Sequence, residues 1–364
     1  MAKLNVHKSE PLNAEPPLPA LSEAFLTPVE RFYIRTHGEI PRLDGARHRL
    51  RVEGLVSEPL DLSMAELRTR FPRRVVTATL QCAGNRRAEL SEVAPVSGTQ
   101  WDAGAIGTAE WAGVALSDVL RAAGVWETTS KELHVAFEAA DQVSEEGSQF
   151  TYGASIPLTK ALSDEVLLAD EMNAAPLAPE HGFPLRVVVP GYIGARSLKW
   201  LTLVRLQDRP SDNPFQQKEY KLYPPEMSED GIDPDAGTIL YEFPLNAVIC
   251  APTEGAVLRA GLVALRGYAV ASGRPIERVE VSTDAGRSWT RAEMEAGRGE
   301  RWAWTLWTAH VELLAGAHEL IVRAWDGAAQ TQPERAEHVW NPKGYVGSAW
   351  HRVRVRVDDN PLTR

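Results

Sequence analysis

Apolar and polar positions in the first two-thirds of the chain change their period several times, which indicates a mixture of strands and short helices. Ser63 is followed three positions later by Glu66, a capping box that begins a short helix, and Pro72 ends it. A second helix is expected over residues 114–123, with Gly124 as its left-handed terminator. Strands are expected at residues 47–56, 75–80, 133–138 and 185–189. The spacing is not a regular βαβ repeat, so we expect an α+β fold with a mixed α/β domain rather than a doubly wound sheet.

The pattern changes after about residue 240, where short strand-like segments follow one another between turn signals. In the last of them Val353, Val355 and Val357 alternate with arginines, which gives one buried and one solvated face. The expected strands are residues 261–270, 276–283, 302–309, 318–326 and 350–357. This spacing is typical of an immunoglobulin-like β-sandwich. We therefore expect three regions: an irregular N-terminal arm on the surface (1–28), a mixed domain (29–240) and a sandwich (241–364).

Composition narrows the range of partners. The chain has 364 residues and a formal net charge of -10, which argues against binding to nucleic acid or to an anionic membrane. No segment approaches the roughly 20 apolar residues of a membrane span, and residues 1–28 contain no apolar run typical of an export signal. The two cysteines, Cys82 and Cys250, imply no disulfide framework. These observations predict a reduced, cytoplasmic protein.

Cys82 stands at the end of an expected buried strand, in the segment Leu-Gln-Cys-Ala-Gly-Asn-Arg-Arg. Gly84 and Asn85 permit a tight turn with exposed backbone N–H groups, and the charges of Arg86 and Arg87 would favour a thiolate. A thiolate suits metals that bind through sulfur. The sequence lacks a G-x-S-x-G elbow, a P-loop and an H-E-x-x-H helix, so a functional cysteine here is a nucleophile or a lone soft ligand. The residues alone leave this role and that of a buried structural cysteine equally open.

The segment 80–87 resembles the signature of sulfite oxidases and assimilatory nitrate reductases. Further blocks follow in the order of that family, at residues 32–41, 104–113, 152–157, 172–173, 181–200, 340–344 and 349–353. The resemblance covers nearly the whole chain, and the block 181–200 is highly specific. It implies a molybdopterin-binding catalytic domain followed by an immunoglobulin-like dimerisation domain. It also implies molybdenum held by the Cys82 thiolate and by the dithiolene of molybdopterin, which together form the molybdenum cofactor (Moco).

The same resemblance assigns side chains to the cofactor. Molybdopterin ends in a phosphate, which fixed cations and backbone N–H groups bind through charge-assisted hydrogen bonds. Asp141 matches a carboxylate that the family uses on the pterin, and Arg196 is expected to support the pocket. The cofactor-binding positions implied are Ile34, Arg35, Thr36, His37, Asp141, His181, Arg186, Ser197, Leu198 and Lys199.

The activity that the resemblance implies is oxidation of sulfite to sulfate by oxygen-atom transfer at the Cys-ligated metal. Electrons would pass to oxygen or to a separate acceptor such as a cytochrome, and the chain would form a homodimer through its sandwich. Arg35 matches the main substrate arginine of the family, Tyr220 the tyrosine near the reacting oxygen and Trp101 a tryptophan of the substrate pocket. For Trp101, simple core packing is the alternative.

Three positions depart from the pattern of the family. Ser97 stands where animal sulfite oxidases carry a lysine, and Glu219 replaces an aspartate. A second substrate arginine, contributed by the C-terminal domain, aligns with Glu293, and Arg291 nearby would partly substitute for it. Each charge-assisted hydrogen bond contributes about 1.5–3 kcal/mol, so the loss of one or two cations predicts weak capture of a dianion or a substrate of lower charge.

Two other functions are compatible with the sequence. A molybdenum reductase of nitrate or of an S- or N-oxide would use the same cofactor, although Tyr220 disfavours nitrate because the related nitrate reductases replace that tyrosine. A non-catalytic cofactor-binding or assembly protein would have no need of Arg35, Cys82 and Tyr220 together. Assays in both directions and the molybdenum content of purified protein separate the three.

Overall fold

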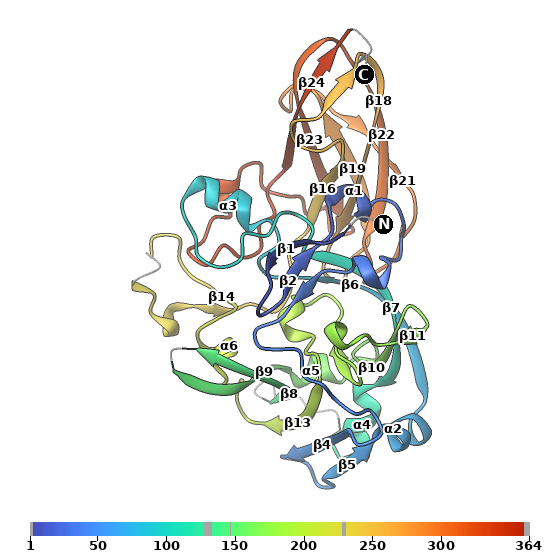
Figure 1. Ribbon diagram of the computed structural model, residues 1–364, viewed down its shortest axis with the longest axis vertical. Coiled ribbons are helices and arrows are strands. Elements are labelled where there is room, and N and C mark those ends of the chain that lie inside the picture. Colours follow the sequence, from blue (N-terminus) through green and yellow to red (C-terminus); the bar gives the residue numbers. More distant parts are fainter. Residues whose placement is uncertain (1–2, 127–132, 146, 228–230, 360–364) are drawn as a thin grey trace.

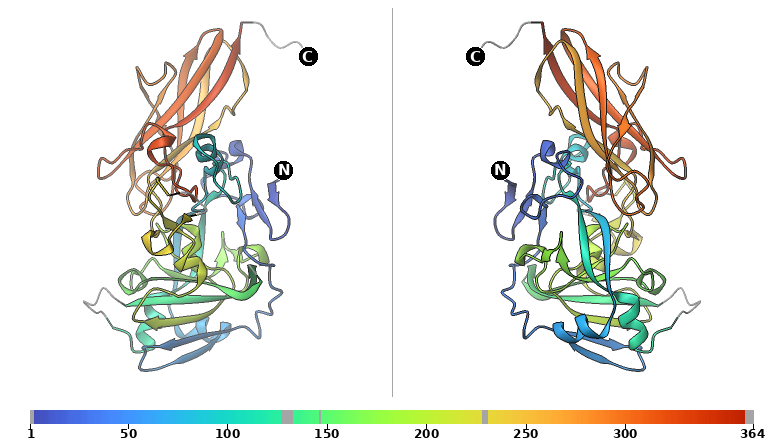
Figure 2. Two further views of the ribbon diagram at one scale, coloured as in Figure 1. Left: turned by 90° about the vertical axis from the view of Figure 1, so that its left-hand side faces the viewer. Right: turned by 90° about the vertical axis from the view of Figure 1, so that its right-hand side faces the viewer.

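A computed structural model of the chain describes residues 3–126, 133–145, 147–227 and 231–359. The molecule is elongated, with the C-terminal strands at one end and a mixture of strands and short helices at the other (Figures 1 and 2). Strands β1 (Asn5–Lys8) and β2 (Asn13–Glu15) lie at the waist between these two parts (Figure 1). None of the helices in the described residues has the length and apolar character needed to cross a membrane.

Two five-stranded sheets form most of the N-terminal part. The first contains β6 (Arg73–Gln81), β7 (Ile106–Ala115), β10 (Leu167–Met172), β11 (Ala175–Pro176) and β12 (Arg186–Val188). The second contains β4 (Arg49–Gly54), β5 (Leu60–Ser63), β8 (His134–Glu145), β9 (Ser148–Pro157) and β13 (Leu201–Gln207). The strand orders are β11-β10-β7-β6, with β12 paired to β10, and β5-β4-β13-β8-β9. Pairing is antiparallel throughout except between β13 and β4.

Short elements connect and flank these sheets. The helices are α1 (Leu18–Leu21), α2 (Met64–Arg70), α3 (Arg87–Val93), α4 (Leu116–Ala122), α5 (Leu158–Ala161) and α6 (Pro214–Gln217). A small sheet joins β1 and β2 to β3 (Ile34–Arg35), and β14 (Lys221–Leu222) pairs with β15 (Thr238–Ile239). The chain is mostly β with few helices, which confirms the expected α+β class and gives strands the larger share.

Both predicted helices are present, and one begins later than expected. In α2 the side chain of Ser63 accepts a hydrogen bond from the backbone N–H of Glu66. The carboxylate of Glu66 in turn accepts a hydrogen bond from the backbone N–H of Ser63, so the capping box is complete. The helix α4 begins at Leu116 rather than at residue 114, because Val114 and Ala115 still belong to β7 and pair with β10. Gly124 has a positive φ of 81° and follows the end of α4, as predicted.

The interpretation of residues 1–28 as an irregular surface arm is wrong over its first half. β1 pairs antiparallel with β2, and β2 pairs antiparallel with β3. All three residues of β2 are buried, including the polar Asn13 and Glu15. All four residues of β1 are exposed, so the strand shows none of the alternation by which a half-buried strand is predicted from sequence.

The C-terminal part is a β-sandwich, as the spacing of its strands predicted. One sheet contains β16 (Asn246–Ala251), β18 (Gly261–Val270), β22 (Thr305–Leu313) and β21 (Glu293–Met294). The other contains β17 (Val257–Arg259), β24 (His351–Asp358), β23 (Gly316–Asp326), β19 (Ile276–Ser282) and β20 (Thr290–Arg291). In β24 the valines at 353, 355 and 357 are buried in the core between the sheets, whereas Arg354 and Arg356 are exposed.

The two parts pack on each other through buried polar contacts as well as apolar ones. The backbone N–H of Thr79 in β6 donates to Trp302 O (2.9 Å), and Trp304 N donates to Thr79 Oγ1 (2.8 Å). The hydroxyl of Tyr268 donates to Ala103 O (2.8 Å), and the buried Arg86 donates to Asn246 Oδ1 (2.7 Å). One hydrophobic cluster contains side chains from both parts, so the core continues across the boundary.

Candidate active site

Two adjoining cavities meet where β6 ends. We name them the inner cavity, lined by residues between Phe32 and Tyr220, and the outer cavity, whose lining also includes residues near both ends of the chain. Four residues line both cavities: Arg35, His37, Cys82 and Tyr220. These shared residues are therefore the boundary at which a molecule held in one cavity would contact a molecule held in the other.

Cys82 follows β6 directly and begins a tight turn, in which Asn85 N donates to Cys82 O (3.0 Å). The thiol is buried, and burial raises its pKa, while the positive charges of Arg35 and Arg87 oppose this rise. The expectation that Arg86 would favour the thiolate is wrong. Its guanidinium instead donates to Glu89 and Asn246, so it joins the two parts of the molecule.

Arg35 lies on β3, and its side chain reaches the boundary between the two cavities. The small sheet β1-β2-β3, called the N-terminal sheet below, fixes its position. Its Nη1 atom donates to Asn13 Oδ1 (3.1 Å) and to the backbone oxygen of Thr36. The same Asn13 oxygen accepts from the backbone N–H of Thr36 (3.3 Å). Of the predicted cofactor-binding residues in this segment, Thr36 and His37 line the inner cavity, whereas Ile34 lies in β3 outside the lining of both cavities.

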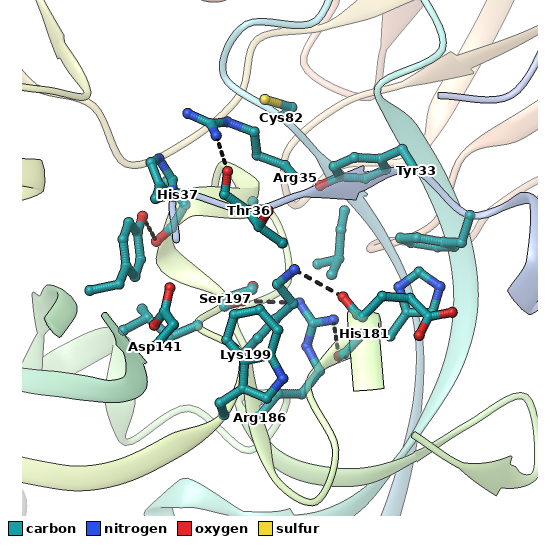
Figure 3. A pocket seen from close by; sticks show the side chains of 18 of the residues that line it. Tyr33, Arg35, Thr36, His37, Cys82, Asp141, His181, Arg186, Ser197 and Lys199 are labelled. Carbon is teal, nitrogen blue, oxygen red and sulfur yellow. Dashed lines mark hydrogen bonds between the residues drawn. The ribbon is translucent and has the colours of Figure 1, made fainter. Parts of the chain in front are cut away.

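Buried cations gather in the inner cavity around β12 and the 3-10 helix η3 (Gly194–Arg196), away from Cys82 (Figure 3). Lys199 Nζ donates to Glu180 O (2.9 Å), and Arg186 donates to His181 O (2.8 Å) and Ser197 O (2.9 Å). All of these acceptors are backbone oxygens. In the described part of the chain no carboxylate forms a salt bridge with Arg35, Arg186 or Lys199.

Burial of these cations shifts their proton equilibria. Burial, reinforced by Arg186, lowers the pKa of Lys199 to about 7, and burial lowers the pKa of Arg186 to about 10. His181 is buried, and burial and the charge of Lys199 lower its pKa to about 3, so its ring is neutral near pH 7. Concentrated buried positive charge without carboxylate partners is unfavourable unless an anion enters the cavity.

Asp141 lines the same cavity, and its Oδ1 atom has no hydrogen-bond partner among the described residues. Burial raises its pKa to about 6, although Lys199 opposes the rise. Ser197 and Leu198 also line the inner cavity, as predicted, and the Ser197 hydroxyl accepts from the backbone N–H of Val189 (3.0 Å). A buried carboxylate oxygen with no partner indicates a hydrogen-bond donor that arrives with a ligand.

Tyr220 borders both cavities with a positive φ of 50°, a strained conformation for a residue with a side chain. Arg196 maintains it: this fully buried guanidinium donates to Tyr220 O (3.4 Å), to Leu240 O and to Gln216 Oε1 (2.6 Å). Arg196 therefore supports the pocket from behind, as expected. The Tyr220 hydroxyl lies 2.7 Å from His37 Nε2.

Trp101 is fully buried and still forms part of the wall of the outer cavity, so it combines the two alternatives considered for it. Ser97 belongs to the same wall. Glu219 lies opposite, where Lys343 Nζ is 2.7 Å from its Oε1 atom and the Tyr345 hydroxyl donates to its Oε2 atom (2.8 Å). The outer cavity is thus bordered by residues from the beginning, the middle and the end of the chain.

Although it placed the charge of Arg87 near Cys82, sequence reasoning gave no role to two cations of the outer cavity. Arg87 and Lys343 both line it, and the guanidinium of Arg87 lies over the ring of Tyr345, 5.1 Å from its centroid. The alignment of the C-terminal cation with Glu293 is wrong, because Glu293 lies in β21 of the sandwich and Arg291 in β20, outside the lining of both cavities. The sequence feature that could have identified Lys343 is the segment Trp-Asn-Pro-Lys-Gly. The resemblance included this segment but assigned no role to its lysine.

Comparison with known proteins decides the family. Residues 37–215 match the oxidoreductase molybdopterin binding domain, and residues 237–358 match the Mo-co oxidoreductase dimerisation domain. The chain is 44% identical to sulfite oxidase of Gallus gallus over 356 residues, which are 96% of this chain and 77% of that protein. It is 41% identical to sulfite oxidase of Arabidopsis thaliana, over 99% of this chain and 95% of that protein. The chain belongs to the sulfite oxidase family.

Membership in the sulfite oxidase family settles the class of the protein. It is a molybdenum-dependent oxidoreductase whose cofactor is Moco, with a C-terminal dimerisation domain. The fold agrees: the crystal structure of the sulfane dehydrogenase SoxCD from Paracoccus pantotrophus superimposes with a TM-score of 0.82 at 26% identity, over 98% of this chain and 90% of that chain. The resemblance noted in the sequence is confirmed over nearly the whole length.

The inner cavity of this sulfite oxidase family member fits Moco in the chemistry of its donors. One end offers the Cys82 sulfur, and the other offers buried cations without carboxylate partners, as a phosphate requires (Figure 3). In the same cavity Asp141 presents an unpartnered carboxylate oxygen that suits the N–H groups of a pterin. A soft ligand, a hydrogen-bond acceptor and buried cations thus occur together in one cavity, which is the set of donors and acceptors that the cofactor needs.

Proposed function

We propose that this enzyme oxidises sulfite to sulfate. The observation that carries the proposal is the charge of the outer cavity, where Arg35, Arg87 and Lys343 border a space that reaches Cys82. A small oxyanion with two negative charges suits such a space, because charge-assisted hydrogen bonds from fixed cations bind and orient it. The names of the two relatives support the same substrate. In the overall reaction, sulfite and water give sulfate, two protons and two electrons.

We propose that Cys82 ligates the metal and that the inner cavity holds the pterin and its phosphate. Lys199, Arg186 and His181 would contact the phosphate end, together with backbone groups at Ser197 and Leu198. Asp141 would accept hydrogen bonds from the pterin. When bound, Moco supplies the oxygen atom that sulfite gains and takes up the two electrons that sulfite loses.

The residues shared by both cavities would orient the substrate beside Cys82. Arg35, fixed by Asn13, keeps its positive charge and faces the substrate from the N-terminal sheet. Burial raises the pKa of Tyr220 to about 12, so the phenol keeps its proton near neutral pH and donates a hydrogen bond. Burial and the charges of Arg35 and Lys199 lower the pKa of His37 well below its usual range, so its ring is neutral beside the Tyr220 hydroxyl, 2.7 Å from Nε2. Trp101 would exclude water from one side.

The remaining assignments belong to the same proposal. Electrons would leave one at a time to a separate acceptor such as a cytochrome, or pass to oxygen. The catalytic domain would comprise residues 29–240, the dimerisation domain residues 241–364, and two copies would associate through the sandwich. Light scattering on the purified enzyme tests the association, and a monomer across the micromolar range would contradict it.

The test of the proposed function is anaerobic addition of sulfite to the Moco-loaded enzyme. We expect rapid bleaching of its thiolate-to-metal absorption, formation of sulfate, and sulfite-dependent reduction of ferricyanide. Cys82→Ser should abolish all three, while Cys250→Ser, which changes the buried cysteine of β16, should keep the activity per bound molybdenum. A Moco-loaded enzyme whose absorption does not respond to sulfite would refute the proposal. The function to test next would then be reduction of nitrate or of an S- or N-oxide.

A further inference from the structure

His7 is a wall residue of the outer cavity to which the proposed reaction gives no role. It lies on β1 of the N-terminal sheet, and its ring faces Trp101 edge-on, with 5.0 Å between the ring centroids and 66° between the planes. Its Nε2 atom lies 2.6 Å from Glu15 Oε1. The imidazole is thus fixed by contacts on two sides, in contrast to the other side chains of this exposed strand.

Glu15 is buried, and each of its oxygens has defined partners. Oε1 accepts from Asp102 N (2.8 Å) in addition to His7, and Oε2 accepts from Gly104 N (2.9 Å). A side chain at Gly104 would collide with this carboxylate, because its Cβ would lie 2.9 Å from Glu15 Oε2. The same carboxylate therefore orients both His7 and the backbone that follows Trp101.

The second ring nitrogen of His7 is available to a ligand. Nε2 is occupied by Glu15, and Nδ1 has no partner within the part of the chain that the structure describes. The side chain is 22% exposed, so solvent and solutes in the outer cavity reach it. A neutral ring that donates from Nε2 to Glu15 offers only a lone pair at Nδ1, whereas a protonated ring offers an N–H to an anion. The Glu15 carboxylate partly compensates the positive charge that such protonation creates.

We propose that His7, oriented by Glu15, is a substrate-binding residue of the outer cavity that donates from Nδ1 to an incoming oxyanion in its protonated form. The inference deepens the proposed function, on which it rests, because it adds an imidazole donor to a cavity whose cations are arginines and lysines. Ser97, in the same wall, carries no charge. The charged groups that line this side of the cavity or contact the pair are Lys8, Glu15, Arg35, Arg87 and Asp102.

Binding of sulfate, the product, tests the inference without turnover. Sulfate remains a dianion across the neutral range, whereas sulfite changes its protonation there, so a single form of the ligand is measured. Equilibrium dialysis of the loaded enzyme with radiolabelled sulfate at about pH 6 gives the affinity of the wild type. His7→Asn should weaken this binding about tenfold, a factor that corresponds to about 1.4 kcal/mol.

Two further variants separate charge from mere packing. His7→Lys places a charged donor at the same position and should bind sulfate about as tightly as the wild type. His310→Asn makes the same change as the test variant on the exposed face of β22 and should behave as the wild type. The KM for sulfite should rise in His7→Asn about as much as sulfate affinity falls, with a small change in kcat.

Three results would overturn the inference. They are sulfate binding by His7→Asn equal to that of the wild type, His7→Lys no better than His7→Asn, and a wild-type enzyme that binds no sulfate. The failure of the proposed function is recognised separately, because it concerns the response of the loaded enzyme to sulfite. An enzyme that binds sulfate through His7 and does not oxidise sulfite would refute the proposed function and leave the oxyanion site intact.

Discussion

Lys343 and Glu219 form an ion pair at the edge of the outer cavity, and this pair sets how much positive charge an anion meets there. The Lys343 side chain is 18% exposed, and Tyr345 holds the other oxygen of Glu219. If Lys343 is removed, a partly buried carboxylate without its cation remains beside the substrate. Repulsion then adds to the loss of attraction.

We predict that Lys343→Met raises the KM for sulfite by about tenfold or more, since a charge-assisted contact is worth about 1.5–3 kcal/mol. The variant kcat should change less, because the residues at the boundary with the inner cavity are untouched. Steady-state kinetics with ferricyanide measure both constants. Lys218→Met, at an exposed position that does not line the cavity, is the matched control. Equal KM values in Lys343→Met and the wild type would contradict a role in anion capture.

Asp141 gives a prediction for the cofactor-free protein. Its pKa is raised from 3.8 to about 6 by burial, so the folded state disfavours the charged form. Its contribution to stability is therefore complete below about pH 4 and is lost as the pH rises through about 6. Asp141→Asn removes this loss, and we expect the variant to be about 2–3 kcal/mol more stable than the wild type at pH 7 but equally stable at pH 4.

Urea denaturation at the two pH values measures this difference in the free energy of unfolding. The same substitution should lower the molybdenum content of the purified enzyme, because the amide presents N–H groups where the pterin needs an acceptor. A variant that is less stable than the wild type at pH 7 would show that Asp141 has an internal partner instead of awaiting a ligand.

At the scale of single residues, sequence reasoning located the inner cavity better than the outer one. Most of the proposed cofactor-binding residues come from two continuous segments that the resemblance covered, residues 34–37 and 181–199. The outer cavity is assembled from short segments far apart in the chain, and Lys343 and His7 contribute to it through tertiary packing that no local pattern reports. Glu293 was assigned by alignment alone, which does not report where a residue lies in the fold.

Among the elements, the segment around Tyr220 depends most on one buried side chain. Arg196, in the 3-10 helix Gly194–Arg196, connects this segment to Gln216 in α6 and to Leu240 after β15. The positive φ of Tyr220 is unfavourable for a residue with a Cβ atom, so the conformation persists because these bonds specify it.

We predict that Arg196→Lys lowers the free energy of unfolding by about 2–4 kcal/mol, because buried backbone and amide oxygens lose their donors. It should also lower kcat, since Tyr220 would no longer keep one position. Arg209→Lys, at an exposed site with a single aspartate partner, is the control and should change neither quantity. Denaturant unfolding and steady-state kinetics provide the two measurements. If Arg196→Lys is less stable than the wild type but keeps the full kcat, Arg196 contributes to stability and has no role in positioning Tyr220 for catalysis.

Element prediction succeeded where burial alternates and failed where it does not. β18 has the predicted ends, and α2 has the predicted cap, because both carry strong local signals. The helix α4 was extended too far, since Val114 and Ala115 continue an apolar run without a break between strand and helix. β1 escaped notice because all four of its residues are exposed, so its sequence shows no alternation, and its pairing with β2 leaves no local pattern.

For the whole molecule, the contacts between the two parts include several buried hydrogen bonds. Arg86 and Asn246, Tyr268 and Ala103, and Thr79 and Trp302 all bond across the boundary in buried positions. Separation of the parts would expose these groups and the shared apolar cluster together. The predicted division into a catalytic and a dimerisation domain therefore does not imply independent stability.

We expect the enzyme to unfold in a single calorimetric transition, whose calorimetric and van't Hoff enthalpies agree per unit of unfolding. Arg86→Met should move the whole transition to lower temperature without splitting it, because it removes a bond at the boundary and leaves Asn246 without its partner. Two resolved transitions in the wild type would show that the boundary contacts are too weak to couple the parts.

The near-separation of the two cavities has an evolutionary consequence. Among the residues that the structure describes, Arg35, His37, Cys82 and Tyr220 alone belong to both linings. Mutations elsewhere in the outer wall, on β1 or near Lys343, leave the proposed Moco-binding positions unchanged. Selection is thus free to retarget the outer cavity toward other small anions while it conserves the inner one. A lineage with this scaffold acquires a new substrate by altering a few surface-proximal positions, without an interval in which the cofactor is lost.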